Sequence, residues 1–247
     1  MHQYKFLLIS ILAIILILLI IDGIRIFGLL KISKNVIEKS IKFERINSNA
    51  TKKIIVIGDS TAYGTGSRDP MHTTAGYLGA LYKDAEIKNY GVIGQKIKDL
   101  NKEIQNYNIK YADLLLIHVG GNDILQFTPI SEIEKSLYEL LEKVKDSSKK
   151  IAILHTGNIG NSPFFPRYLG WIMTKRARAV REIYMLAAEK YKIAYVDLFQ
   201  TRKDDVFNKN VDTFYAADLI HPADLGYKYW FQKILEALEK TYGTTEI

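Results

Sequence analysis

Four short polar motifs follow one another along this chain, and their residue types suit nucleophilic catalysis. They are Gly-Asp-Ser at 58–60, Asn-Tyr-Gly-Val-Ile-Gly at 89–94, Gly-Gly-Asn-Asp at 120–123 and Asp-Leu-Ile-His at 218–221. Together they supply a hydroxyl, an imidazole with a nearby carboxylate, and amide groups that can donate hydrogen bonds. A binding protein seldom needs all of these groups, so the set favours an enzyme that forms a covalent intermediate.

The hydroxyl of Ser60 is the expected nucleophile, exposed by a turn at Gly58. Serine becomes nucleophilic only when a neighbouring base takes its proton, and that base works only in the correct tautomer and orientation. We expect His221 to be the base and Asp218, three residues earlier, to orient its imidazole. Because Pro222 biases His221 towards an extended backbone, we place this pair in a loop.

The reaction also needs hydrogen-bond donors for the negative charge that develops on a carbonyl oxygen. Donors aimed at this oxygen are each worth roughly 3 to 4 kcal/mol. We expect an oxyanion hole formed by the backbone amides of Ser60 and Gly94 and the side-chain amide of Asn122. Asp59 and Asp123 lie beside these groups and are expected to brace loops by accepting backbone hydrogen bonds.

The part of the chain from residue 52 onward alternates apolar, β-branched runs with helical patterns, which implies a parallel sheet covered on both faces. The first three motifs directly follow the first three expected strands, so they lie on one rim of the sheet, where ligands collect in such folds. The fourth motif precedes the last helix. Strands are expected at 54–57, 87–90, 113–119, 150–155 and 193–198, and helices at 73–83, 97–107, 131–147, 168–191 and 223–240.

Residues 6–21 form an apolar run in which Ser10 is the only polar residue. A membrane-spanning helix needs about 17 to 25 residues, so this run is just long enough with snorkelling flanks. A core helix would show a polar stripe, and a signal peptide would end in a small-residue cleavage site. Neither feature is evident, so we expect an uncleaved anchor at 1–30, a basic juxtamembrane linker at 31–51 and a catalytic domain at 52–247.

Most of the net charge of +7 lies near the N-terminus. Residues 1–53 contain nine basic and three acidic residues, which leaves the remainder of the chain nearly neutral. This argues against a nucleic-acid-binding protein, which needs a concentrated basic face. The basic residues after the apolar run slightly favour a catalytic domain on the cytoplasmic side, although short N-terminal anchors often export the domain attached to them. Residues 31–45 fit an interfacial helix or a solvated linker equally well.

The motifs G-D-S, N-x-G-x-x-G, G-x-N-D and D-x-x-H-P, in this order, resemble the SGNH (GDSL-type) hydrolase family over roughly residues 52–240. The resemblance implies a flavodoxin-like three-layer α/β/α fold with a five-stranded parallel sheet, ester hydrolysis through an acyl-enzyme, and no metal or organic cofactor. Transferred by position, it makes Ser60 the nucleophile, Gly94 and Asn122 oxyanion donors, and Asp218 and His221 the acid and base.

One departure from the family pattern is Thr61, which stands where the family name has leucine. This position varies and does not touch the chemistry. The chain also lacks a G-x-S-x-G elbow, which argues against the α/β-hydrolase fold. The absence of cysteine excludes a thiolate nucleophile and a cysteine-ligated metal.

An aromatic stretch at 162–173 comes after the fourth strand on the same rim, and it offers Phe164, Phe165, Tyr168 and Trp171 as candidate substrate contacts. Ordinary packing at the start of a helix is the alternative. If this stretch borders a membrane, the natural substrate is an acyl lipid or another hydrophobic ester.

We therefore expect a membrane-anchored serine esterase or lipase-like hydrolase acting on a small-molecule or lipid ester. A carbohydrate O-deacetylase on the same fold and a catalytically silent binding or scaffold protein are the alternatives. A metal-dependent phosphoesterase should also contain an early D-x-H and a late G-H-x-H cluster, and neither is present. His118 and His155 are expected to pack structurally, and His72 to have a polar role in a loop.

Overall fold

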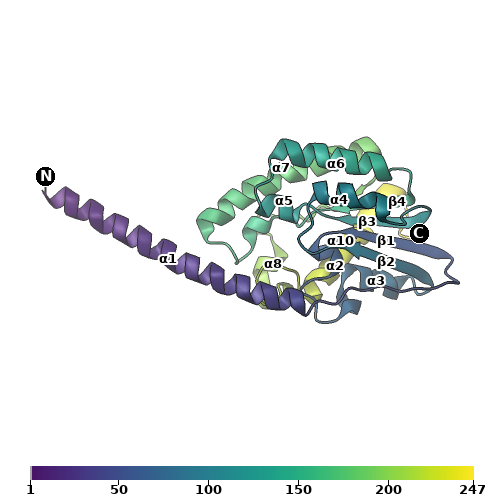
Figure 1. Cartoon of the computed structure of the whole chain (residues 1–247), viewed down its shortest axis with the longest axis horizontal. Coiled ribbons are helices and arrows are strands. Elements are labelled where there is room, and N and C mark those ends of the chain that lie inside the picture. Colours follow the sequence, from purple (N-terminus) through teal and green to yellow (C-terminus); the bar gives the residue numbers. More distant parts are fainter. Residues whose placement is uncertain (1) are drawn as a thin grey trace.

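The computed structural model describes residues 2–247 and contains one five-stranded, wholly parallel sheet with strand order β2-β1-β3-β4-β5 (Figure 1). This is the flavodoxin-like order, in which the chain direction across the sheet reverses between β1 and β3. The α/β fold expected from the sequence is therefore confirmed. The strands are β1 (Lys52–Gly58), β2 (Ala85–Gly91), β3 (Ala112–His118), β4 (Ser148–Leu154) and β5 (Ala194–Tyr195).

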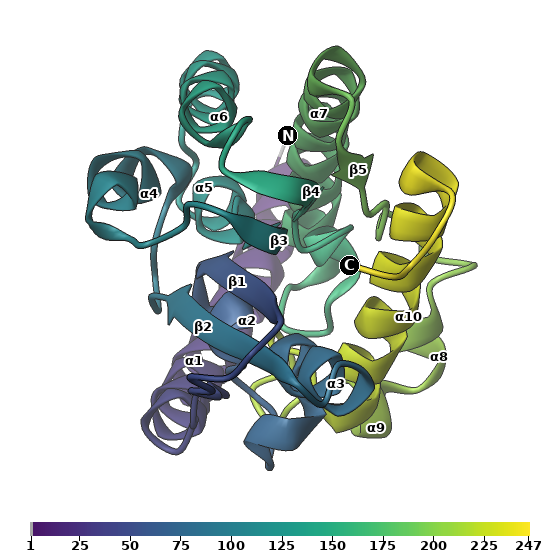
Figure 2. The same ribbon diagram turned by 90° about the vertical axis from the view of Figure 1, so that its right-hand side faces the viewer.

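Helices cover both faces of the sheet. Alternate strand residues point to opposite sides, and those in the middle of β1 and β3 are apolar on both sides. Ile55, Ile57, Leu115 and Ile117 face one layer, and Ile54, Val56, Leu114 and Leu116 face the other. Figure 2 shows these two helical layers on either side of the sheet. The first layer contains α4 (Ile97–Glu103), α6 (Ile130–Val144) and α7 (Arg167–Tyr191), and the second contains α3 (Thr74–Leu81) and α10 (Asp224–Tyr242).

Several boundaries differ from the sequence-based expectation. Strand β5 contains only two residues of the expected 193–198, and helix α4 ends at Glu103, where a 3-10 turn, η2 (Ile104–Asn106), continues the chain. Six short helical turns were not anticipated, because turns of three to five residues are too short to show hydrophobic periodicity. They are α2 (Ser60–Tyr63), η1 (Pro70–His72), α5 (Gly121–Leu125), η3 (Ile159–Asn161), α8 (Val206–Lys209) and α9 (Val211–Phe214).

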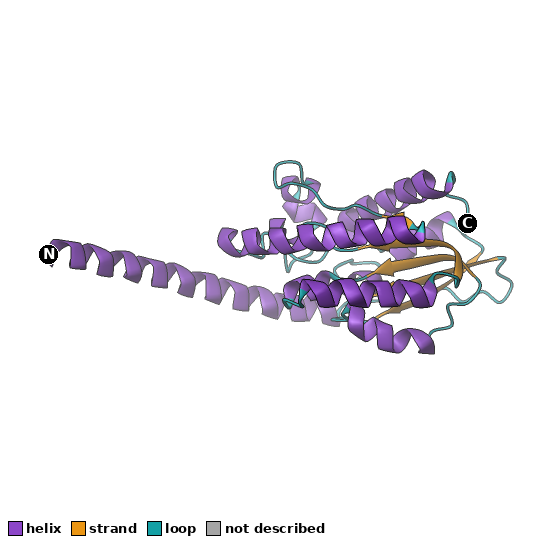
Figure 3. Cartoon of the chain, turned by 90° about the horizontal axis from the view of Figure 1, so that it is seen from above, coloured by secondary structure: helices purple, strands orange, loops and turns teal. Residues whose placement is uncertain are grey.

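The N-terminal helix α1 (His2–Glu38) is continuous through the boundary expected at residue 30. Its apolar first part extends away from the domain, while its second part lies against it (Figure 3). Within residues 2–247, α1 is the one helix long and apolar enough to cross a membrane. The chain then reaches the sheet edge, where the guanidinium of Arg45 donates to the carbonyl oxygens of Gly79 and Ala85 at 2.9 Å each.

Candidate active site

The turn after β1 presents Ser60 at the carboxyl rim of the sheet. Gly58 has φ +137°, and a Cβ atom at this position would lie 1.6 Å from the carbonyl oxygen of His118. Only glycine therefore allows β1 to end so close to β3. Asp59 then caps α2, since its carboxylate accepts hydrogen bonds from the Thr61 amide at 2.8 Å and hydroxyl at 2.7 Å. Ser60 is the first residue of this short helix.

The structure brings together the three residues expected to form a triad. The Oγ of Ser60 lies 3.1 Å from Nε2 of His221, although the two residues are 161 positions apart in the sequence. On the other side of the imidazole, Nδ1 lies 2.6 Å from Oδ2 of Asp218. The hydroxyl, the imidazole and the carboxylate thus form one continuous chain of hydrogen bonds.

Asp218 is held in position by its own loop. Its Oδ1 atom accepts hydrogen bonds from the backbone amides of Ile220 at 3.2 Å and His221 at 3.1 Å. Leu219 has φ +61°, which bends the backbone so that both amides face the carboxylate. Burial alone would raise the pKa of Asp218, but its hydrogen bonds and the charge of His221 lower it below the usual value. The carboxylate therefore stays ionised beside the imidazole.

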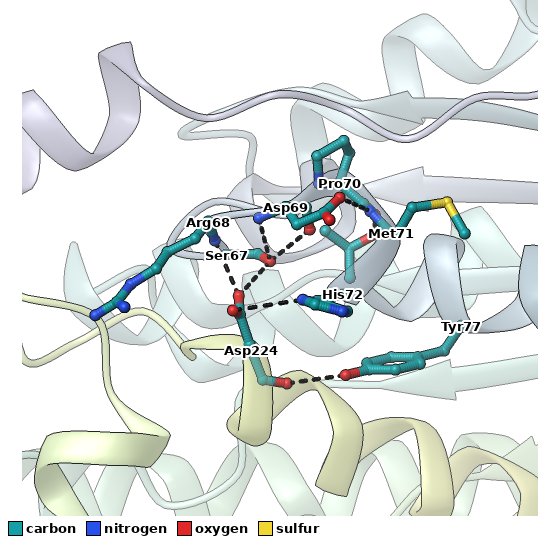
Figure 4. A network of polar contacts seen from close by, with 9 residues as sticks. Ser67, Arg68, Asp69, Pro70, Met71, His72, Tyr77 and Asp224 are labelled. Carbon is teal, nitrogen blue, oxygen red and sulfur yellow. Dashed lines mark hydrogen bonds and ion pairs between the residues drawn. The ribbon is translucent and has the colours of Figure 1, made fainter.

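A polar network fixes the segment after the imidazole (Figure 4). Oδ1 of Asp224, in the first turn of α10, accepts from the Ser67 hydroxyl at 2.7 Å and from the Arg68 amide at 2.9 Å. Oδ2 of Asp224 lies 3.5 Å from Nδ1 of His72. Since the 67–72 segment comes after Ser60 and Asp224 comes after His221, this network ties the nucleophile side of the site to the base side.

The three expected oxyanion donors lie on segments that contact one another. The amide of Val92 donates to the carbonyl of Gly58 at 2.8 Å, which places the loop after β2 beside the turn that carries Ser60. The side-chain amide of Asn122 donates to the carbonyl of Gln95 at 3.1 Å, next to Gly94. Within residues 2–247, no backbone carbonyl accepts from the amides of Ser60 or Gly94. Their role as donors to a substrate remains a prediction.

Gly94 has φ +80°, a backbone conformation that favours glycine, and no atom beyond its two chain neighbours lies within 4 Å of the place where a Cβ would be. The Cα of Gly94 therefore borders open space, which would let a substrate approach the backbone closely at this position.

Buried carboxylates and one amide hold these loops in place. Asp123 accepts from the amide of Ile97 at 3.1 Å, and burial raises its pKa. Asp59 is also buried, which raises its pKa to about 6. Both contacts agree with the expected bracing roles. Sequence reasoning gave no role to Asn89, whose side chain donates to the carbonyl of Ala62 at 2.8 Å and so links β2 to α2.

The remaining buried histidines lie on β3 and just after β4. His118 packs edge-on against Trp230, and burial lowers its pKa to about 3. The Nδ1 of His155 accepts from the amide of Gly157 at 3.2 Å, Nε2 lies 3.2 Å from the hydroxyl of Tyr195, and burial lowers its pKa to about 4. In the part of the chain that the structure describes, no three His, Cys, Asp or Glu side chains form a group that could hold a metal ion.

A groove runs beside the His221 loop, between that loop and the second part of α1. Its lining combines apolar and basic side chains, among them Ile32, Val36 and Lys39 from α1, Leu219 from the loop, and Arg68. The juxtamembrane part of the chain, expected to be a linker, thus forms one wall of a groove that reaches the His221 loop at Leu219.

The aromatic candidates for substrate contact divide into two pairs. Phe164 is buried and packs edge-on against Phe165, which contacts the core below α7. Tyr168 and Trp171 lie on the outer surface of α7 and are exposed. The structure therefore shows packing for the first pair and leaves the second pair available to another partner.

The motif order and the geometry agree with a comparison against protein families. The model of the GDSL-like lipase/acylhydrolase family matches residues 56–229, a range that includes every residue of the candidate triad. The chain belongs to this family. Family membership makes it an ester-cleaving hydrolase, which confirms the resemblance and the enzyme class expected from the sequence.

Solved structures similar to this GDSL-like hydrolase share its fold at low sequence identity. Axe2, an acetylxylan esterase from Geobacillus stearothermophilus, is 22% identical with a TM-score of 0.56, and the match covers 78% of this chain and 96% of that one. A putative lipolytic protein of the G-D-S-L family from Desulfitobacterium hafniense is 18% identical with a TM-score of 0.59, over 74% and 97% of the two chains. The structure of TesA is 19% identical with a TM-score of 0.59, over 77% and 99%. Comparison with curated proteins gave no match.

Proposed function

We propose that this hydrolase is a membrane-anchored serine esterase that cleaves carboxylic esters through an acyl-enzyme on Ser60. The observation that carries the proposal is the chain of hydrogen bonds from Ser60 through His221 to Asp218, with distances of 3.1 and 2.6 Å. These distances are those of a nucleophile, a general base and an orienting carboxylate.

In the acylation step, Oγ of Ser60 forms a bond to the ester carbonyl carbon while its proton passes to Nε2 of His221. Asp218 holds the proton of Nδ1 and stabilises the imidazolium that results. Collapse of the tetrahedral intermediate breaks the bond to the alcohol oxygen, and the departing alcohol takes the proton from Nε2.

In the deacylation step, water attacks the acyl carbon and gives a proton to Nε2, which returns it to Oγ of Ser60 as the carboxylic acid leaves. The negative oxygen formed in both steps is placed between the amides of Ser60 and Gly94 and the side chain of Asn122. The hydrogen bond from Asn122 to Gln95 uses one N–H group and leaves the second for this oxygen.

Helix α1 supports the membrane-anchored part of the proposal, since its apolar residues from Phe6 to Ile21 are exposed along the part of the helix that a bilayer would cover. The groove beside the His221 loop supports an ester with an apolar part, because Ile32, Val36 and Leu219 line it. A carbohydrate O-deacetylase is the second candidate; it is suggested by the likeness to an acetylxylan esterase.

An active-site-directed fluorophosphonate tests the proposed nucleophile. It should label the intact protein, and labelling and ester hydrolysis should both vanish in Ser60→Ala, while chelators leave hydrolysis unchanged. Labelling that persists in Ser60→Ala would contradict the assignment, and complete absence of labelling and hydrolysis would favour a binding or scaffold protein.

The substrate class and the anchor need separate measurements. Rates on p-nitrophenyl esters of increasing acyl length should rise beyond acetyl, whereas a preference for acetyl would favour the deacetylase. The full chain should stay with the membrane after alkaline carbonate extraction, and release would contradict the anchor. A reporter fused after Ile247 identifies the side of the membrane on which the domain lies. The basic residues that follow the apolar run favour the cytoplasmic side.

A further inference from the structure

The N-terminal turns of α7 carry an exposed face that the proposed reaction does not use. Tyr168, Trp171, Ile172 and Lys175 occupy positions i, i+3, i+4 and i+7, so they lie on one side of the helix. The exposed fractions are 47% for Tyr168 and 61% for Trp171. The ammonium group of Lys175 lies 4.1 Å from the centre of the Trp171 ring. We call these four side chains the α7 face.

The α7 face lies beside the end of the apolar run of α1. The guanidinium of Arg25 donates to the carbonyl of Phe164 at 3.1 Å and also to that of Pro163. Tyr168 lies near Asp22: desolvation first, and then the Asp22 carboxylate, raise the pKa of its phenol. Because Asp22 is the first charged residue after the run that ends at Ile21, the start of α7 is level with the expected boundary between hydrocarbon and headgroups.

The direction of α7 also places its N-terminal end near the expected membrane boundary. Its N-terminal end projects from the domain on the side towards which α1 extends (Figure 1). The loop before α7 also comes after the carboxyl end of β4, on the rim that carries the candidate active site. The membrane-side end of the domain and its catalytic rim are therefore the same end.

We propose that the α7 face inserts into the headgroup region of the bilayer that α1 spans, as a second point of membrane contact that turns the catalytic rim towards the lipid. The inference rests on the anchor in the proposed function and identifies the bilayer as the source of the ester. The occupant to which we commit is a phospholipid surface, because the face continues directly from the boundary of the apolar helix.

The residue types suit this location. Tyrosine and tryptophan concentrate at membrane interfaces, where an aromatic ring meets the acyl region and a polar atom stays hydrated. Ile172 adds apolar area, and Lys175 has a long side chain whose ammonium group reaches anionic headgroups. A soluble surface would gain little from an exposed tryptophan, whereas an interfacial helix end gains both apolar burial and a hydrogen bond.

The contact also links the anchor to the candidate active site. Arg25 holds the loop at 163–164, and in the same loop the hydroxyl of Ser162 donates to the carbonyl of Leu219, next to Asp218. The anchor, the α7 face and the His221 loop are therefore connected by direct contacts. The groove lined by Ile32 and Val36 lies between α1 and the His221 loop, on the side from which an ester in the bilayer would approach.

Fluorescence quenching tests the location of the α7 face without relying on activity. The chain has two tryptophans, and Trp230 is buried with an exposed fraction of 5%, so it serves as an internal reference. The full chain is reconstituted in vesicles of phosphatidylcholine and phosphatidylglycerol that carry bromine high on the acyl chains. Brominated lipid should quench part of the emission of the native protein and none in Trp171→Phe.

Quenching that is absent, or equal in Trp171→Phe, would overturn the proposal. Trp171 emission that is protected from aqueous iodide but not quenched by lipid would also overturn it, because another protein surface would then cover the face. Either result leaves the proposed esterase reaction intact, since hydrolysis of a water-soluble ester is measured separately.

A kinetic arm tests the consequence for the substrate. In Tyr168→Ser/Trp171→Ser, hydrolysis of a long-chain ester held in the vesicle should fall about tenfold, as expected when two aromatic side chains lose partial burial. Hydrolysis of water-soluble p-nitrophenyl acetate should not change. Tyr111→Ser is the matched control, because Tyr111 is 90% exposed at the amino end of β3, away from the catalytic rim. Equal losses on both esters, or the same loss in the control, would refute the inference.

Discussion

The hydrogen-bond pattern at Asp218 gives a sharp prediction for Asp218→Asn. Oδ1 accepts two backbone amides, from Ile220 and His221, and Oδ2 accepts only the imidazole Nδ1. An asparagine that keeps its oxygen on the two backbone amides must present its NH₂ group to the imidazole. Nδ1 of His221 then becomes the acceptor and Nε2 carries the proton, so the imidazole can no longer take the proton of Ser60.

The alternative orientation of the asparagine is less favourable. Turning the amide over would restore the bond to Nδ1 but would face its NH₂ group towards two backbone N–H groups. Two lost bonds to these half-buried donors cost more than one, at about 1 kcal/mol each. The tautomer without a free Nε2 base should therefore prevail. A comparable substitution in a serine protease triad lowers kcat about 10⁴-fold, or about 5.5 kcal/mol, and we expect a similar loss here.

Steady-state hydrolysis of a p-nitrophenyl ester measures this prediction. The kcat of Asp218→Asn should fall about 10⁴-fold with little change in KM, and the rate of fluorophosphonate labelling should fall in parallel. Asp146→Asn is the matched control, because Asp146 is exposed in the turn before β4. Thermal unfolding of both variants checks that the fold is retained. A folded Asp218→Asn protein with kcat within tenfold of the native value would refute the tautomer argument.

Other contacts in the domain give three further predictions. Asn122→Ala should lower kcat about 10²- to 10³-fold at nearly constant KM, because it removes one proposed oxyanion donor, and a change confined to KM would contradict this role. Asp59→Asn should gain stability relative to the native protein as the pH rises from 3.8 to about 6, because the folded state keeps the Asp59 proton over this range and the unfolded chain loses it. The native protein should lose up to about 3 kcal/mol of unfolding free energy in this way. Urea unfolding at several pH values measures the difference. Asp224→Ala should lower the free energy of unfolding by about 1 to 3 kcal/mol at neutral pH. Burial alone would raise the pKa of Asp224, but its hydrogen bonds and His72 lower it below its usual value of 3.8. The contribution should therefore be present above pH 3.8 and be lost as the pH falls further, and a pH-independent difference would refute the network as its source.

The buried strands and the catalytic rim were predictable because their signals are local. Buried parallel strands require continuous apolar runs, and the runs at β1 and β3 are wholly buried on both faces. A polar motif directly after such a strand must lie at the carboxyl end of the sheet, whatever the details of packing. Strand β5 was harder to delimit, because only Ala194 and Tyr195 of the strand expected at 193–198 pair with β4.

Details of the site could not be predicted because they depend on contacts between distant segments. The positive φ of Leu219, the network at Asp224 and the link from Asn89 to α2 leave no periodic signal in the sequence. Each is a geometry that only the packed loops impose. The same holds for Arg25, whose partners lie 138 and 139 residues away.

The sequence by itself determined the apolar helix, the alternation of strands and helices, and the residue types available at the rim, because each depends on neighbouring residues along the chain. Only the tertiary structure decided that Ser60 and His221 lie within hydrogen-bond distance and that α1 forms a wall of a groove with Leu219 of the His221 loop. Such contacts arise when the crossovers close and both faces of the sheet are packed, so their geometry belongs to the whole fold and to no single segment.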